Sequence, residues 1–159
     1  NKNGGESMRN AIIIVSAIIL SLTAIYFFFI RGIRGMNEVF LIPEGFTGCV
    51  GIYYNQKGAK SLIKKEKKIV YEIPENGKLM TSSPQNFGWA KENESGGYDA
   101  TFYYVNNKGE KTQKISHEKI GYEYTNENYS DSTGETLRSY TFYISEKKNK
   151  FPDSVKCDN

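Results

Sequence analysis

The feature that most constrains this chain is Ala11–Ile30, a run of twenty residues without a charged side chain, between Arg9 and Arg31. A helix rises about 1.5 Å per residue, so this run can cross the roughly 30 Å hydrocarbon core of a bilayer. Cleaved secretory signals have shorter apolar cores, of about 7–15 residues, and end in small residues. Here the run ends in Tyr26-Phe-Phe-Phe-Ile30, which favours an uncleaved transmembrane anchor.

The arginines on the two sides of the apolar run nearly balance, so the positive-inside rule favours neither direction. A short basic start before an apolar run is typical of an export signal. We therefore expect a single-pass protein of the bacterial cell membrane, with the following domain outside the cytoplasm. The alternative is a cytoplasm-facing domain that acts as an inhibitor or immunity-type partner.

Residues 1–10 are a polar N-terminal tail ahead of the apolar run. Asn3–Met8 can be encoded by a nucleotide sequence that holds GGAGG shortly before an ATG, which is the layout of a bacterial ribosome-binding site. Met8 would then be the start, with residues 1–7 as translated leader, and an ordinary polar tail is the alternative. After the run, residues 31–37 contain two glycines and predict a hinge.

Charge excludes one class of partner. Four of the 21 basic residues and one of the 18 acidic residues precede Asn37, so the rest of the chain carries 17 of each. A neutral domain lacks the basic surface that binds nucleic acid. We therefore expect no nucleic-acid partner, and we interpret the basic residues beside Ala11–Ile30 as flanks of a segment whose partner is the lipid bilayer.

From residue 38 to 148 the pattern changes to short β-branched and aromatic runs separated by turn residues. Val50, Ile52 and Tyr54, for example, share one face of a predicted strand. The strands are predicted over Val39–Ile42, Thr47–Asn55, Lys67–Ile73, Lys78–Thr81, Tyr98–Val105, Lys111–Ser116, Ile120–Thr125 and Leu137–Ser145. Their spacing predicts an all-β fold, a single antiparallel β-sandwich behind one transmembrane helix, with residues 149–159 as a C-terminal tail.

Pro43, Gly45 and Gly48 mark the start of the domain. Proline fixes φ and glycine admits a positive φ, so Pro43 and Gly45 predict a turn before the Thr47–Asn55 strand. Gly48 and Gly51 would let another backbone or ring approach that strand closely. We favour a structural role for this motif over a ligand site.

Two further stretches predict turns of different chemistry. Asn76-Gly77 is a tight-turn signal between Lys67–Ile73 and Lys78–Thr81. Lys64–Lys68 reads Lys-Lys-Glu-Lys-Lys, which is typical of a solvated hairpin edge where lysines block unwanted strand pairing. The alternative is a basic surface that contacts an anionic envelope polymer.

Cys49 and Cys157 are the two cysteines of the chain. Two thiols cannot build a Cys₄ metal site, and no Cys-x-x-Cys spacing occurs. They could form one disulfide that closes most of the domain, which requires an oxidising compartment. Two unrelated thiols are the alternative.

Few residues of this sequence are candidates for metal binding, ligand binding or catalysis. His117 is the single histidine, has no cysteine or aspartate at ligand spacing, and is expected on the surface. The acidic stretch Asn126–Glu135 offers oxygen ligands for calcium but lacks EF-hand spacing, so a solvated loop is favoured. Trp89 with Phe87 could stack a sugar or a peptide, and a core position is favoured. We expect no metal, no cofactor and no enzyme.

Phe40–Gly48 reads Phe-Leu-Ile-Pro-Glu-Gly-Phe-Thr-Gly. Shorter pieces follow in order: Ile73-Pro74 with Gly77, Thr81-Ser-Ser83, Gly88-Trp89 and Tyr103-Tyr-Val105. With these features the chain resembles a bacterial family known only as a domain of unknown function, over about Phe40–Gln113. The resemblance implies a single extracytoplasmic β domain behind a signal or membrane segment, and no catalytic residues. A transthyretin-like sandwich is one candidate for its fold.

These observations favour a domain that works by binding or assembly at the cell envelope, with an envelope protein or polymer as partner. The rival from another class is a small envelope hydrolase that uses the tyrosine- and carboxylate-bearing face of the sandwich. An enzyme should show a cleft with clustered, perturbed titratable groups.

Overall fold

The computed structural model describes residues 3–30, 34–130, 135–153, 155 and 157. The chain divides into two compact units, Asn1–Arg34 and Gly35–Asn159, and each is described by itself. Residues 31–33 of the predicted hinge lie outside the described part. Gly35 packs tightly, because a Cβ at this position would lie 2.3 Å from the Ser95 carbonyl oxygen.

The first unit is one helix, α1, over Asn3–Ile30. Its Met8–Phe27 segment has a mean hydropathy of 2.2 and is long and apolar enough to cross a membrane. The hydroxyls in this segment donate to carbonyl oxygens one turn earlier, at 2.8–2.9 Å; these are Ser16 to Ile13, Ser21 to Ile18 and Thr23 to Leu20. Internal pairing of polar groups is what a lipid environment requires of a helix.

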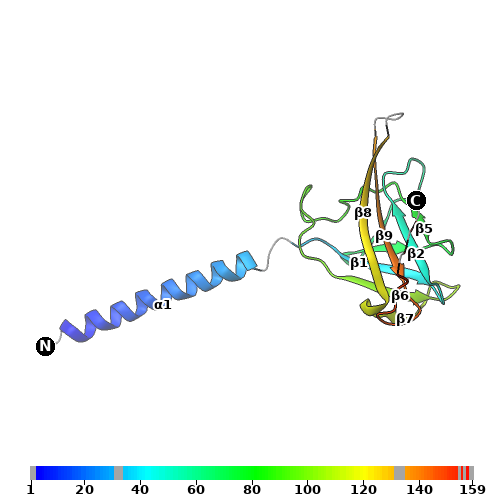
Figure 1. Cartoon of the computed structure of the whole chain (residues 1–159). Helices are drawn as coiled ribbons and strands as arrows, with labels where there is room; N and C mark the ends of the chain where they lie inside the picture. The colour runs from blue at the N-terminus through cyan, green and yellow to red at the C-terminus, as the bar shows by residue number, and fades with distance from the viewer. Residues whose placement is uncertain (1–2, 31–33, 131–134, 154, 156, 158–159) are drawn as a thin grey trace. The chain divides into compact units, whose positions relative to one another are not determined.

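The second unit is all-β, as the sequence predicts, with its described strands in two sheets (Figure 1). The strands are β1 Asn37–Pro43, β2 Gly48–Tyr53, β3 Ile63–Lys65, β4 Lys68–Glu72, β5 Lys78–Met80, β6 Ala100–Val105, β7 Lys111–Ile115, β8 Ile120–Ser130 and β9 Glu135–Ile144. The five-stranded sheet has the order β3-β4-β1-β6-β7, and the four-stranded sheet has the order β5-β2-β9-β8. A 3₁₀ turn, η1 His117–Lys119, leads from β7 to β8.

The prediction of purely antiparallel sheets is wrong, because both sheets are mixed. β1 runs parallel to β4 and β6, and β2 runs parallel to β5. The chain alternates between the sheets, so a strand that returns to its sheet after crossing over is free to lie parallel to its neighbour. Strands that follow one another within a sheet form the antiparallel pairs β3–β4, β6–β7 and β8–β9.

The Asn76-Gly77 turn shows this crossing. The Gly77 N–H donates to the Pro74 carbonyl at 2.9 Å, and the Lys78 N–H donates to Asn76 Oδ1 at 3.0 Å. The turn therefore forms as predicted, yet β4 and β5 lie in different sheets. Glycine is required because a Cβ at Gly77 would lie 2.5 Å from the Cys49 carbonyl oxygen.

Aromatic rings join the two sheets. Phe40 on β1 stacks on Tyr71 of β4 and on Phe102 of β6, with centroid distances of 4.6 and 4.7 Å. These three residues are register partners in adjacent parallel strands, so their rings lie side by side. Phe142 of β9 meets Phe40 and Phe102 edge-on at 5.5 and 5.4 Å. Edge-to-face contacts of this kind stabilise a core beyond the area that they bury.

The loop predicted at Asn126–Glu135 is largely strand. β8 continues to Ser130 and β9 begins at Glu135, so the two form a long hairpin (Figure 1). Arg138 Nε lies 2.7 Å from Glu127 Oε1, which uses one carboxylate of the candidate calcium loop. Asp131 lies outside the described residues. Tyr129 is the one aromatic residue of Asn126–Glu135, so the polar stretch reads as a loop although its backbone pairs as a two-stranded ribbon.

Candidate binding site

The sheet order leaves one side of the sandwich open. β7 and β8 are edge strands of the two sheets on the side where η1 connects them. β3 and β5 are the edge strands on the other side, and the connection from β2 to β3 is the chain between them.

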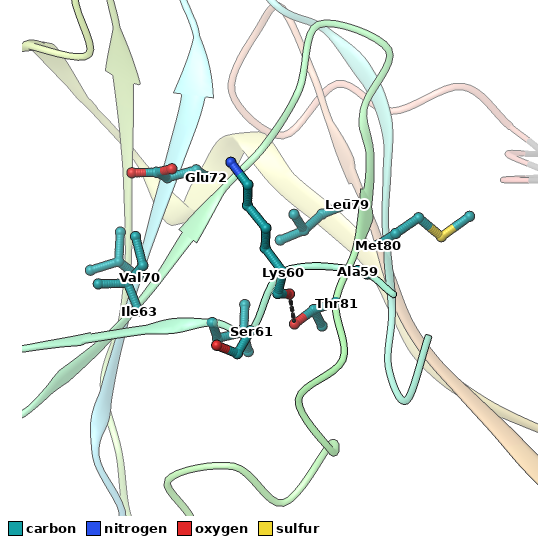
Figure 2. Close-up of a pocket in the computed structure, with 10 residues that line it drawn as sticks. Ala59, Lys60, Ser61, Ile63, Val70, Glu72, Leu79, Met80 and Thr81 are labelled. Carbon is teal, nitrogen blue, oxygen red and sulfur yellow. Dashed lines mark hydrogen bonds between the residues drawn. The ribbon is translucent and has the colours of Figure 1, made fainter. Parts of the chain in front are cut away.

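A groove of about 490 Å³ lies on this open side (Figure 2). Its apolar lining comes from Ile63 of β3, Val70 of β4, and Leu79 and Met80 of β5. Ile63 and Met80 are 46% and 51% exposed, which is high for large apolar residues of a strand. Exposed apolar side chains gathered at one place are typical of a binding surface.

Two buried hydroxyls hold the chain segments that border the groove: Thr81 lines it, and Ser83 bonds to the adjoining Leu62. Thr81 Oγ1 donates to the Lys60 carbonyl at 2.9 Å, and Ser83 Oγ accepts from the Leu62 N–H at 2.9 Å. The Ser83 N–H in turn donates to Thr81 Oγ1 at 3.1 Å. These bonds hold the β2–β3 connection against the chain after β5. The sequence shows Thr81-Ser-Ser83 as a motif, but only the structure shows what the hydroxyls hold.

The groove carries positive charge on its rim. Residues 60–78 contain six lysines and three glutamates, within a domain that is neutral overall. Lys60 and Glu72 are the charged residues that line the groove, and Figure 2 shows the Lys60 side chain reaching across it with its ammonium end on the side of Glu72. Lys64 faces the opposite side of β3 from Ile63, and its Nζ lies 4.2 Å from the centroid of the Phe87 ring, where the ring face attracts a cation.

The basic run Lys64–Lys68 forms the β3–β4 hairpin, with β3 as a strand that the sequence pattern does not predict. Lys65 pairs with Lys68, which leaves Glu66 and Lys67 as the two turn residues. Both have positive φ, 51° and 59°. This is the two-residue turn that Asn-Gly occupies best, and other L residues are strained there.

Replacing Glu66-Lys67 by Asn-Gly should raise the free energy of unfolding by about 1–2 kcal/mol, because it relieves two left-handed residues. Thermal unfolding of the full chain in detergent measures the change. Replacing Glu75-Asn76, where neither residue has a positive φ, by Asn-Gly is the matched control and should not stabilise. A destabilised Asn-Gly hairpin would contradict this account of the turn.

A second depression of about 440 Å³ lies on the outer face of the five-stranded sheet. Val39 and Leu41 form part of its floor, and Lys68 and Lys111 are among its charged residues. It shares Ile63, Val70 and Glu72 with the groove. The two depressions therefore meet at β3 and β4.

Glu38 is a carboxylate on the inner side of the sandwich that the sequence pattern did not identify as a candidate. Glu38 lies on the core-facing side of β1, where Tyr71 Oη donates to its Oε1 at 2.9 Å. Burial raises the pKa of Glu38 to about 7, and the Tyr71 hydrogen bond lowers it in part. Glu38 has the same strand parity as Phe40 and Ile42, and this parity is the signal that could have placed it inside.

Tyrosines of both sheets interact with Glu38: Tyr71 of β4, Tyr140 of β9, and Tyr54 directly after β2. Burial raises the pKa of Tyr54, Tyr71 and Tyr140, and the charge of Glu38 raises each of them further. Tyr140 Oη donates to Glu123 Oε2 at 2.6 Å. These residues, with Tyr98, form the Glu38 cluster, which joins both sheets and does not line the groove.

The structure joins Cys49 to Cys157 in a disulfide, with 5.4 Å between their Cα atoms. Described residues of the predicted C-terminal tail, residues 149–159, contact the four-stranded sheet. Tyr124 Oη donates to the Cys157 carbonyl at 2.9 Å, and Tyr122 Oη donates to the Pro152 carbonyl. The Phe151 ring takes the space beside Gly121, where a Cβ would lie 2.7 Å from the ring.

The remaining residues predicted from the sequence lie apart from the groove. His117 is exposed in η1, with its ring 5.5 Å from that of Phe102. In the described ranges no three His, Cys, Asp or Glu side chains gather as a metal site. Phe87 packs against the core, whereas Trp89 is half-buried.

The Pro43 turn forms, with the Phe46 N–H donating to the Pro43 carbonyl at 3.1 Å. Gly45 and Gly48 have φ of 76° and 114°. A Cβ at Gly48 would meet no atom within 4 Å, so the expected close approach is wrong there. The left-handed backbone is the reason that glycine is required at this position. At Gly51 the close approach is confirmed, because a Cβ would lie 2.9 Å from the Tyr53 ring.

The geometry defines a class of protein: a mixed two-sheet β domain with a groove between two edge strands, in a chain that also contains the apolar helix α1. A family model matches residues 34–151, and the chain belongs to that family of unknown function, DUF6843. This confirms the family resemblance and extends it beyond Gln113.

A crystal structure of a Bacillus anthracis protein, provisionally named a lipoprotein, has the same fold, with a TM-score of 0.61. The two chains are 21% identical, and the match covers 78% of this chain and 84% of the other. A comparison with curated proteins gave no match.

Proposed function

We propose that this chain is a membrane-anchored domain that acts outside the cytoplasmic membrane of a bacterial cell, by binding or assembly in the envelope and without catalysis. The observation that carries the proposal is the disulfide between Cys49 and Cys157, because structural disulfides persist in oxidising compartments. The apolar Met8–Phe27 segment and the lipoprotein name of the structural neighbour support an envelope location. The groove supports a binding role.

Topology reporters fused after Asn159 test the location. In a bacterial host, alkaline phosphatase at this position should be active and green fluorescent protein should be dark, because phosphatase folds only after export. A membrane-impermeant maleimide should label Cys49 and Cys157 in intact cells only after reduction. The reverse result, with bright fluorescence and inactive phosphatase, would overturn the proposal and favour a cytoplasm-facing inhibitor or immunity-type partner.

The Glu38 cluster is the one observation that favours a hydrolase as a second candidate. A carboxyl group with a pKa near 7 is suited to general acid–base catalysis. Chromogenic ester, amide, glycoside and phosphoester substrates would test it on the purified full chain. Turnover that is lost in Glu38→Gln would favour the hydrolase and contradict the non-catalytic proposal.

A further inference from the structure

We propose that the groove between β3 and β5 binds an extended acidic segment of a partner protein, which adds a strand to the open side of the sandwich. The inference names the partner class for the binding role and therefore rests on the proposed function. Three features of the described residues support it: backbone geometry, exposed apolar side chains and charge.

The backbone of β5 offers an edge. Gly51 N–H donates to the Gly77 carbonyl at 2.8 Å, and Thr81 N–H donates to the Tyr53 carbonyl at 2.9 Å, so alternate residues of β5 face β2. The residues between them, Lys78 and Met80, direct their backbone groups to the opposite edge. The Lys78 N–H is already bonded to Asn76 Oδ1, so the edge offers the Lys78 carbonyl and the N–H and carbonyl of Met80. In the described sheets no strand pairs with that edge. Such an edge is a template for an added strand.

Side chains of both sheets would contact the added strand. Ile63 and Val70 come from the five-stranded sheet, and Leu79 and Met80 come from the four-stranded sheet. A peptide in this groove would cover the exposed parts of Ile63 and Met80 and would bridge the two sheets. Apolar side chains at alternate positions of the peptide suit this contact, because successive residues of a strand face opposite ways.

Charge selects an acidic peptide. Lys60 lines the groove, Lys65 lines the depression that adjoins it, and Lys78 belongs to the edge strand β5. Glu72 is the acidic residue in the lining. A polyanion alone would be attracted to the lysines, but it would leave the apolar side chains uncovered and the β5 edge unpaired. A peptide with alternating acidic and apolar residues fits all three features.

Peptide binding to the full chain in neutral-detergent micelles tests the proposal. The probe is a fluorescent decapeptide of alternating Glu and Val, followed by fluorescence anisotropy. We expect saturable binding that Met80→Lys weakens at least tenfold, about 1.4 kcal/mol, because the charge enters the apolar lining. Leu137→Lys is the matched control, since Leu137 is a strand residue that is 40% exposed outside the groove, and it should bind normally.

Charge and strand addition have their own readouts. Lys60→Glu combined with Lys78→Glu should weaken binding at least tenfold, whereas Lys114→Glu combined with Lys147→Glu should leave it unchanged. Hydrogen exchange at the Met80 amide should slow when the peptide binds, whereas the Lys78 amide, which already donates to Asn76 Oδ1, should change less. A decapeptide of alternating Lys and Val should not bind.

Four outcomes would overturn the proposal. The acidic peptide could fail to bind at concentrations up to about 1 mM, or the basic peptide could bind as tightly as the acidic one. Leu137→Lys could weaken binding as much as Met80→Lys does, or the chain could bind long-chain inorganic polyphosphate and not the acidic peptide. The topology reporters are independent of these measurements. If the reporters show an exported domain and the peptide does not bind, the proposed partner is wrong and the proposed location is still supported.

Discussion

Cys157→Ser is expected to lower the free energy of unfolding of the β domain by about 4 kcal/mol. The disulfide joins residues 108 apart in the sequence, so its loss restores a large conformational freedom to the unfolded chain. The chain-entropy estimate for a closed loop of about 100 residues is about 4.7 kcal/mol, and native disulfides of small secreted domains contribute about 2–5 kcal/mol. A loss of this size lowers Tm by roughly 15 °C in a domain of this size.

Thermal unfolding of the full chain in detergent, with and without reductant, measures the effect. The wild-type chain should respond to reductant, and Cys157→Ser should not respond further. The double variant Cys49→Ser/Cys157→Ser should match the single variant, because one missing sulfur already breaks the bond. A loss below about 1 kcal/mol would show that the C-terminal segment adds little constraint to the unfolded chain.

Glu38→Gln is expected to stabilise the domain at pH 8 and to have little effect at pH 5. Burial raises the pKa of Glu38 from 4.5 to about 7, so between these values the folded state binds more protons than the unfolded state. The contribution of Glu38 to stability therefore falls as the pH rises through this window, by up to about 3 kcal/mol. Glutamine keeps a carbonyl acceptor for Tyr71 and removes the charge, which restores about 2 kcal/mol above pH 7.

Denaturant unfolding of both proteins from pH 4 to pH 9 measures the difference. Glu75→Gln is the control, because Glu75 is exposed and the exchange should leave the pH profile unchanged. Tyr71→Phe should move the midpoint of the Glu38 contribution to higher pH, since the Tyr71 hydrogen bond lowers the pKa of Glu38. A constant difference between wild type and Glu38→Gln across the range would contradict a buried, titrating carboxyl.

The strand predictions are confirmed where apolar residues occupy every second position of the strand. Val50, Ile52 and Tyr54 are buried as expected, because β-branched and aromatic residues at every second position bury one face of a strand. β3 was missed because a three-residue strand of Ile63 and two lysines has no period to detect. β8 was cut short because, beyond the Asn126–Ser139 pair, β9 pairs with β8 but not with β2, so this two-stranded part needs no buried face.

The candidate site depended on pairings that run across the sandwich. Ile63 and Met80 are separated by a full crossing between the sheets, so no local pattern places them in one groove. Glu38 could be assigned to the inner face by parity, but its pKa depends on burial by the surrounding core and on the Tyr71 hydrogen bond. The Phe40–Gly48 motif identified the family of the domain. This motif forms the end of β1 and the following turn, and it does not line the groove.

The sequence by itself determined an apolar helix, a neutral all-β domain, its turns and its family. These follow from local chemistry: hydrophobic length, a period of two, and the backbone freedom of glycine and proline. Only the tertiary structure decided the parallel pairings, the groove, the buried Glu38 and the Cys49–Cys157 bond. Each of these joins residues that are distant in the chain, and such contacts arise from packing between the sheets.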